Sequence, residues 1–274
     1  MENILLFNSK EYKKCKTESE KLDKLGRTIL NETVLYINNE EHRICEVEFY
    51  LLNLAHPDPF VHGDQDQKTP LKWYFHKMNG VYKGGTYKGL DMTFGYKDDD
   101  KAYGGMLIRS IKPKDKAVIE GPCRVVDYIL KQNNAPHVAD YVGENGLLPC
   151  VTHPSLYVTY KPNHYPDETV FVGPRVGLTL KKKGGDRFGY VMKDYRYLTH
   201  PKDIKKYKNT IIANLLYSGK SSADVVTLTK ASAGNVEKYR TTYVAGKDHK
   251  KEEFTGKDFK SDDLLHLYYL THNA

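Results

Sequence analysis

The chain has 274 residues, of which 39% are hydrophobic and 28% charged, and its net charge is +7. A chain of this length can bury a core without disulfides or metal ions as cross-links. No run of about 18 apolar residues, as a membrane span requires, occurs in it, and its opening segment MENILLF is too short and too acidic for a secretory signal.

The net charge indicates which class of partner the protein can bind, and the cysteines indicate its redox compartment. A pI of about 8.9 permits a polyanionic partner without requiring one. The four cysteines, Cys15, Cys45, Cys123 and Cys150, form no CxxC pair. We therefore expect free thiols in a reducing compartment, the nucleus or the cytoplasm.

The first regular elements are a helix and two strands. Apolar residues at near-helical spacing predict a helix over residues 19–30, although Gly26 weakens it. Residues 34–37 are typical of a strand, and Asn38-Asn39-Glu40 of the turn after it. The next strand, Arg43 to Leu51, is the most informative segment of the chain.

Side chains alternate between the two faces of this strand. The core face carries Cys45, Val47, Phe49 and Leu51. The other face carries Ile44, Glu46, Glu48 and Tyr50, so two carboxylates and a tyrosine stand in a row on a strand backed by the core.

Further along, residues 56–105 are rich in Gly, His, Tyr and Lys, and we expect little regular structure there. Residues 106–111 predict a buried strand that contains one charge, Arg109. Gly121-Pro122 predicts the start of a helix, because Pro is favoured at the first helical position.

The last third of the chain is less informative. Residues 170–180 are strand-like on both sides of Gly173-Pro174-Arg175, and residues 181–185 predict an exposed basic turn. Residues 211–217 fit a helix or a strand, and residues 262–270 fit an amphipathic segment that closes the chain.

Two candidate functional groups follow from the residues alone. Glu48 beside Tyr50 suits a general base on a rigid strand, and the alternative is an ordinary solvated strand face. Arg109 needs a partner if it is buried, so it either holds a carboxylate or an anionic substrate group, or lies at an edge with its head group in water.

The segment from Tyr82 to Gly89 (YKGGTYKG) interleaves tyrosine, lysine and glycine. Lysines can meet phosphates and tyrosines can stack on bases, and a tight exposed hairpin fits the segment equally well. The scattered histidines show no metal-binding spacing, so we expect no metal and no cofactor.

Eight short motifs of the chain match, in the same order, the motifs of one protein family. CEVEFYL at residues 45–51 is similar to V-E-T-E-A-Y-L, and MLIRSIKP at residues 106–113 to V-L-L-R-A-x-E-P. The other motifs occupy residues 21–26, 58–63 with 68–70, 75–82, 121–122, 173–177 and 195–197.

Together these motifs resemble the alkyladenine (3-methyladenine) DNA glycosylases of the mammalian and bacterial type. The resemblance implies a base-excision enzyme that flips an alkylated or deaminated purine out of double-stranded DNA. It implies that Glu48 activates water and that Arg109 supports Glu48 and the water. Tyr50 and His62 would bind the base together with Tyr82, whereas the inserted Tyr87 and the phosphate-binding Lys83 and Lys88 would contact the DNA.

The chain also departs from that family. Its second stacking tyrosine aligns with Gly84, and no asparagine stands where the family excludes the amino group of guanine. Residues 201–274 have no counterpart.

We expect an α+β fold with a curved, mostly antiparallel sheet in one domain (residues 1–200) and a C-terminal extension (residues 201–274) packed on it. We expect a monomer that does not bind membranes. Two rival functions remain: a non-catalytic reader of damaged or distorted nucleic acid, and a nucleoside or glycoside hydrolase that uses Glu46 and Glu48 as a pair.

Overall fold

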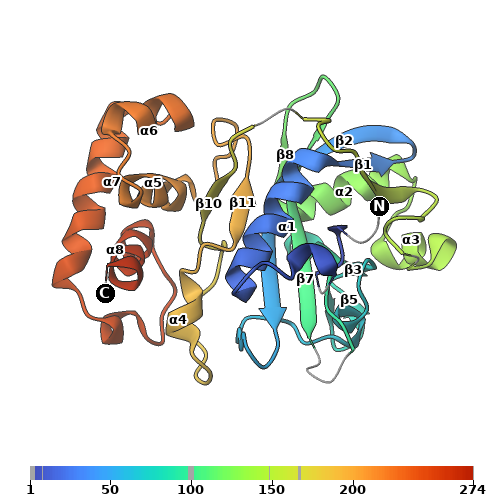
Figure 1. Ribbon diagram of the computed structural model, residues 1–274, viewed down its shortest axis with the longest axis horizontal. Helices are drawn as coiled ribbons and strands as arrows, with labels where there is room; N and C mark the ends of the chain where they lie inside the picture. The colour runs from blue at the N-terminus through green and yellow to red at the C-terminus, as the bar shows by residue number, and fades with distance from the viewer. Residues whose placement is uncertain (1–3, 8, 98–101, 148, 166–167, 274) are drawn as a thin grey trace. The chain divides into compact units, whose positions relative to one another are not determined.

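The computed structural model of the chain describes residues 4–7, 9–97, 102–147, 149–165 and 168–273 (Figure 1). Helices and antiparallel strands are mixed, which confirms the predicted α+β class. The chain forms two compact units: unit 1 comprises residues 1–57 and 61–170, and unit 2 comprises residues 58–60 and 171–274. The division thus falls at residue 170 and not at the expected position after residue 200.

Unit 1 is built on an antiparallel sheet. In this sheet each strand pairs with its neighbours through antiparallel ladders. The strands are, in spatial order, β9 (Leu156–Tyr160), β1 (Thr33–Ile37), β2 (Glu40–Leu52), β7 (Tyr103–Pro113), β6 (Leu90–Thr93) and β3 (Trp73–Phe75), with β8 (Ile119–Glu120) beside β7.

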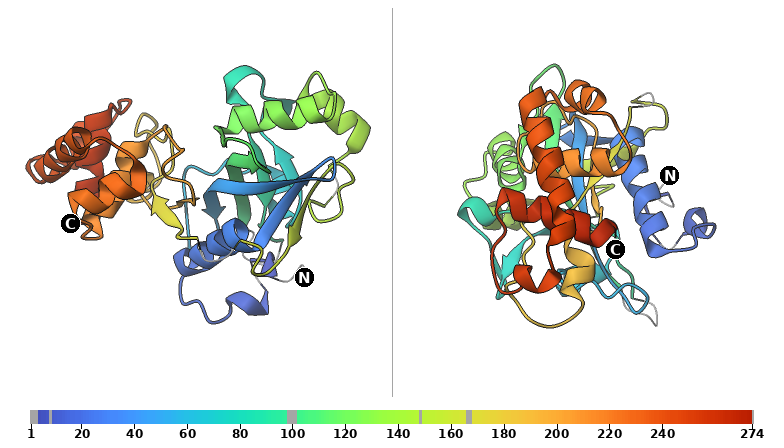
Figure 2. Two further views of the ribbon diagram at one scale, coloured as in Figure 1. Left: turned by 90° about the horizontal axis from the view of Figure 1, so that it is seen from above. Right: turned by 90° about the vertical axis from the view of Figure 1, so that its left-hand side faces the viewer.

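Helices cover both faces of this sheet, as Figure 2 shows from above. α1 (Glu18–Glu32) packs on β2 with the apolar side that its spacing predicts, and Thr17 caps its first turn. α2 (Pro122–Gln132) packs on β7 and begins with the expected proline. It is followed by α3 (Val138–Asn145).

The turn between β1 and β2 follows from its residues. Asn38 and Asn39 have φ angles of 49° and 65°. A two-residue hairpin loop with both residues in the left-handed region matches the twist of the strands, and asparagine tolerates this region well. The turn therefore sets the register of β2 and, with it, the face on which Glu48 lies.

Residues 56–105 contain more regular structure than expected. Besides β3 and β6, they form the hairpin β4 (Lys77–Met78) and β5 (Val81–Tyr82) and two short 3-10 helices, η3 (Gln65–Lys68) and η4 (Gly85–Tyr87). These elements have two to four residues each, so they are too short to show a periodic pattern in the sequence.

Unit 2 is mostly helical. The expected strand over residues 170–180 is wrong beyond β10 (Phe171–Gly173), because Pro174 has no N–H for a ladder. β10 pairs with β11 (Arg196–Leu198) and packs on α5 (Lys208–Tyr217). The helices are α4 (Arg187–Val191), α5, α6 (Ser222–Thr229), α7 (Ala233–Ala245) and α8 (Ser261–His272), with the 3-10 helices η5 (Gly246–Asp248) and η6 (Lys251–Phe254) after α7.

A buried ion pair explains why residues 58–60 belong to unit 2. Nη2 of Arg175 donates to Oδ1 of Asp58 at 3.3 Å, Nη1 reaches Oδ2, and both side chains are fully buried. Arg175 also donates to the carbonyl oxygen of Tyr190 at 3.1 Å. A charge this deeply buried needs such a partner.

Two further expectations concern membrane-spanning helices and the state of the cysteines. Within the part of the chain that the structure describes, every helix is too short or too polar to cross a bilayer. All four cysteines are free, as expected.

Candidate functional site

An irregularity in the β2–β7 ladder shapes the site in unit 1. Ile44 pairs with Ile111, Glu46 with Ser110, and Val47 with Ile108, so the register shifts on both sides of Glu46. A bulge of this kind bends a strand and redirects its side chains. It allows the consecutive residues Arg109 and Ser110 to reach the same carboxylate.

The carboxylates of Glu46 and Glu48 converge on one guanidinium. Nε of Arg109 lies 3.0 Å from Oε1 of Glu46 and 3.3 Å from Oε1 of Glu48. Ser110 donates its hydroxyl hydrogen to Oε2 of Glu46, and Tyr50 donates to Oε2 of Glu48 at 2.9 Å. Of the alternatives open for Arg109, the structure shows the one in which the buried head group holds a carboxylate.

The side chains of Glu46, Glu48 and Arg109 are almost completely buried. The exposed fraction of the side chain is 0% for Glu48, 1% for Glu46 and 6% for Arg109. Burial lowers the pKa of Arg109, and the neighbouring Glu48 and Glu46 raise it by more, so the net shift is upward and the guanidinium stays charged. The hydroxyls of Ser110 and Tyr50 add one hydrogen bond to each of the two buried carboxyl groups.

A second polar group lies on the same face of the sheet. Leu107 of β7 pairs with Glu48 on one side and with Asp91 of β6 on the other, and Asp91 pairs with Tyr74 of β3. Residues opposite each other in antiparallel strands point to the same face. Glu48 and Asp91 thus stand in one row, two strand spacings or about 10 Å apart.

Asp91 holds a histidine. Nε2 of His76 lies 2.7 Å from Oδ1 of Asp91, and the rings of His76 and His62 are in edge contact with centroids 4.6 Å apart. Gly105 of β7 leaves room for this carboxylate, because a Cβ there would collide with Asp91. His62 therefore lies in a histidine–aspartate group beside the glutamate cluster, and we find it packed on His76 and Tyr74.

Burial, and next the nearby His76, lower the pKa of His62 from 6.5 to about 4. The unfolded chain therefore takes up a proton near pH 6.5 that the folded chain refuses until about pH 4. The contribution of His62 to stability is complete above pH 6.5 and is lost as the pH falls toward 4.

We expect the free energy of unfolding to fall more steeply between pH 7 and pH 4.5 in the parent than in a His62→Gln variant, by about 1–2 kcal/mol after allowance for partial exposure. Urea unfolding followed by the fluorescence of Trp73, the single tryptophan of the chain, measures it. A variant of the exposed His137 should behave like the parent, and equal slopes for the parent and His62→Gln would contradict the prediction.

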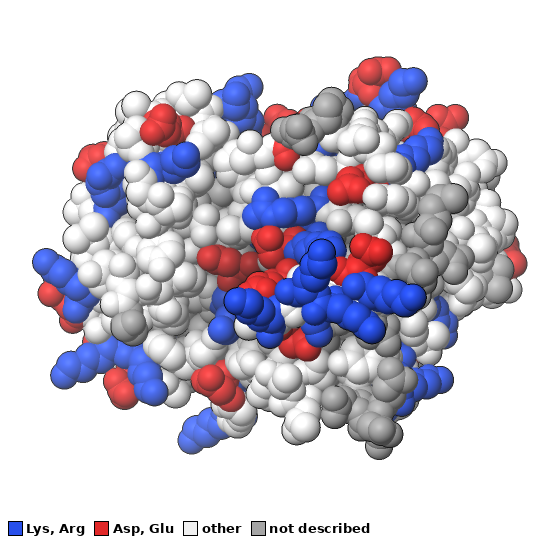
Figure 3. All heavy atoms as spheres, in the orientation of Figure 1, with Lys and Arg blue, Asp and Glu red and all other residues white. Residues whose placement is uncertain are grey.

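The surface gives no simple outline of an interface. On the face drawn in Figure 3, Lys and Arg side chains gather near the middle, where Asp and Glu side chains border the group, and elsewhere the charges are scattered. The predicted DNA contacts must therefore be judged residue by residue.

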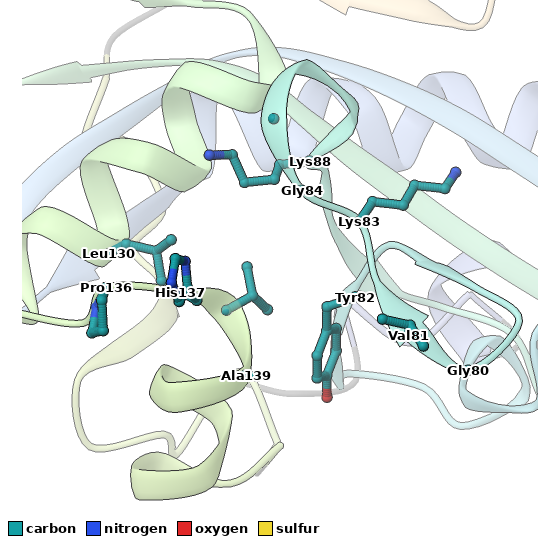
Figure 4. Close-up of a pocket in the computed structure, with 12 residues that line it drawn as sticks. Gly80, Val81, Tyr82, Lys83, Gly84, Lys88, Leu130, Pro136, His137 and Ala139 are labelled. Carbon is teal, nitrogen blue, oxygen red and sulfur yellow. The ribbon is translucent and has the colours of Figure 1, made fainter.

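The expected DNA-binding loop borders a hollow of about 450 Å³ between residues 80–88 and residues 130–139 (Figure 4). Tyr82, Lys83 and Lys88 line it, whereas Tyr87 is 78% exposed. Lys88 extends toward α2, where its ammonium pairs with Asp127, and Lys83 extends the other way. Asp127 therefore competes with a DNA phosphate for the ammonium group of Lys88.

The structure brings Glu48, Tyr50 and Arg109 into direct contact. The resemblance implies that Glu48 and His62 face the same base; Glu48 is completely buried, and neither residue lines the hollow described above. Sequence reasoning missed Asp91, His76 and the role of Ser110, although Ser110 follows Arg109 directly. Among the described residues, no three His, Cys, Asp or Glu side chains are placed to hold a metal ion.

The chain is similar in sequence to a viral protein. No protein-family model matches the chain. The chain is 35% identical over 201 residues to "Uncharacterized protein L759" of Acanthamoeba polyphaga mimivirus, a match that covers 68% of this chain and 89% of the viral protein. At this identity and coverage, the chain belongs to the same family as the mimivirus protein.

Proposed function

We propose that the protein is a monofunctional DNA glycosylase that excises an alkylated or deaminated purine from double-stranded DNA. The observation that carries the proposal is the Glu48 carboxylate, fixed on β2 between the guanidinium of Arg109 and the hydroxyl of Tyr50. The order of the motifs around these three residues, which resembles that of the alkyladenine glycosylases, supports it. The free cysteines suit the nucleus or the cytoplasm as its compartment.

In the proposed reaction the target nucleotide leaves the base stack and the purine stacks on Tyr50. Water attacks the anomeric carbon of the sugar while Glu48 accepts its proton. The new C–O bond replaces the C–N bond, and the electron pair of that bond leaves with the purine. An alkylated purine that is already cationic leaves as a neutral base, whereas a deaminated purine leaves as an anion and takes up a proton from water. Neither step requires a metal.

Tyr50 controls access to the carboxylate in this proposal. Its hydroxyl occupies Oε2 of Glu48, and its own side chain is only half-buried. Rotation of Tyr50 toward a flipped base would free Oε2 for water, whereas Arg109 would keep Oε1 in place. Substrate binding and exposure of the base catalyst would then be one event.

A Tyr50→Phe variant tests this role. We expect it to lose about 1–2 kcal/mol of stability, because a hydrogen bond to a charged group is removed. Excision should persist, because the ring still stacks. Urea unfolding and single-turnover excision measure the two effects, and a loss of excision as large as that of a Glu48 variant would refute the assigned role.

A second candidate is a non-catalytic reader of damaged nucleic acid. The complete burial of Glu48 and the pairing of both its oxygens favour it, because such a carboxylate can serve structure alone. The third function, hydrolysis by a Glu46–Glu48 pair, gains nothing from the geometry. Both carboxylates bind one guanidinium, whereas a catalytic pair faces its partner across the substrate.

One assay separates these candidates. The protein is incubated with labelled duplexes that carry a single methylated or deaminated purine, and abasic products are cleaved with alkali. Excision supports the glycosylase, tight binding of lesion duplexes without excision supports the reader, and turnover of free nucleosides alone supports the third function.

A further inference from the structure

The positive charge of the protein is concentrated in its C-terminal region. Residues 171–274 hold 20 of the 42 Lys and Arg residues but only 11 of the 35 Asp and Glu residues, so their net charge is +9 and that of residues 1–170 is −2. The glutamate cluster lies in unit 1. An excess of this kind favours a polyanionic partner for unit 2.

Two helices of unit 2 form a helix–turn–helix. α6 ends at Thr229, α7 begins at Ala233, and only residues 230–232 connect them. Lys230 takes the left-handed conformation with φ 54°, and the Ser232 hydroxyl caps α7 by accepting from the backbone N–H of Asn235 at 3.3 Å. Figure 1 shows α6 running across the end at which α7 begins. A three-residue turn between two such helices is the geometry of this DNA-binding motif.

The packing fixes this arrangement. α5 contacts both α6 and α7, and α8 packs against α7 from another side. Val225 of α6 and Val236 of α7 are completely buried. Lys208 of α5 donates to the carbonyl oxygen of Thr229 at 2.7 Å, directly before the turn. The pair of helices is thus supported by α5 and α8.

The exposed side of α7 carries side chains that can read DNA. Asn235, Lys238 and Thr241 are exposed and stand three residues apart, so they share one face of the helix. Asparagine can form two hydrogen bonds with adenine and lysine can donate to guanine in the major groove. Lys220 before α6 and Lys230 in the turn are exposed as well and are placed for phosphates.

Gly234, in the first turn of α7, also supports a DNA-binding role for this helix. Glycine in a helix costs about 0.5–1 kcal/mol relative to alanine. A Cβ at Gly234 would meet no atom within 4 Å, so nothing in the fold requires the glycine. A partner whose backbone approaches the start of α7 closely would require it.

We infer that unit 2 binds double-stranded DNA with α7 in the major groove and α6 across the phosphate backbone. In this geometry the N-terminal residues of the second helix contact base edges. The bound duplex needs no lesion, and its sequence is read by Asn235 and Lys238. This function is separate from the chemistry proposed for Glu48.

The test uses the full chain and undamaged duplexes. Selection from a random-sequence duplex pool should yield a sequence preference, and fluorescence anisotropy on the selected duplex should show affinity that falls steeply with salt. An Asn235→Ala/Lys238→Ala variant should bind this duplex about tenfold or more weakly. A Gly234→Ala variant should keep or raise thermal stability yet bind more weakly.

Lys247→Ala is the matched control, because Lys247 is exposed and follows α7 at its far end, more than about 15 Å along the helix from Asn235. It removes the same charge as Lys238→Ala and should change affinity little. Equal losses from Lys247→Ala and the Asn235→Ala/Lys238→Ala variant, the absence of any sequence preference, or stronger binding of duplex RNA would each overturn the inference. Circular dichroism establishes that the variants remain folded.

The two proposals fail separately. Glu48→Gln should leave the affinity for the undamaged selected duplex unchanged, and the α7 variants should leave the excision rate at saturating protein unchanged. A protein that excises nothing but loses duplex binding through Asn235 and Lys238 refutes the glycosylase alone. A protein that excises purines with α7 variants indistinguishable from the parent refutes the inference alone.

Discussion

Replacement of Arg109 by methionine should destabilise unit 1 by about 3–5 kcal/mol, because it leaves two buried carboxylates without their shared cation. Trp73 is the single tryptophan of the chain and is buried in unit 1. Its fluorescence during urea unfolding therefore reports on this unit.

Arg27→Met is the control for that experiment. Arg27 forms an exposed pair with Asp23 on α1, at 2.8 Å with half of its side chain in solvent. An exposed pair contributes about 0–1 kcal/mol, so the control should unfold almost as the parent does. Adding Glu46→Gln and Glu48→Gln to Arg109→Met should restore part of the stability. Equal stability of the Arg109→Met and Arg27→Met variants would contradict the prediction, because it would mean that water reaches the two carboxylates when the cation is removed.

Strand alternation predicted which face of β2 carries Glu48 and Tyr50, because a period of two needs only local sequence. It could not predict the bulge that turns Arg109 and Ser110 toward Glu46. A bulge depends on the register between β2 and β7, and one sequence contains no record of which residues face each other. The charge inside residues 106–111 predicted that Arg109 needs a partner if it is buried, but it left open whether that partner is a carboxylate or a substrate group.

The sequence did not predict the histidine–aspartate group for a related reason. Asp91 lies in a four-residue strand and His76 between two strands of two or three residues, so neither shows a periodic signal. Their contact depends on Gly105, whose missing Cβ makes room for the carboxylate. Long-range pairing also fixed the boundary of unit 2, since Asp58 and Arg175 are 117 residues apart in the chain.

Glu48→Gln should reduce the single-turnover rate of purine excision by at least about 10²-fold, because the amide keeps the shape of the side chain but cannot accept a proton from water. The affinity for lesion duplexes should stay close to that of the parent, since phosphate contacts supply most of it.

Glu46→Gln is the matched control: Glu46 is buried to the same degree and binds the same guanidinium, but it has no role in moving the proton. It should lower stability like Glu48→Gln and reduce excision by less than about tenfold, through the position of Arg109 alone. Equal losses of excision from both variants would make the cluster a structural support, and unchanged excision by Glu48→Gln would remove Glu48 from the mechanism. A rate that falls only when position 48 loses its carboxylate would instead assign the proton to Glu48, because burial, charge and the shared arginine are the same for both residues.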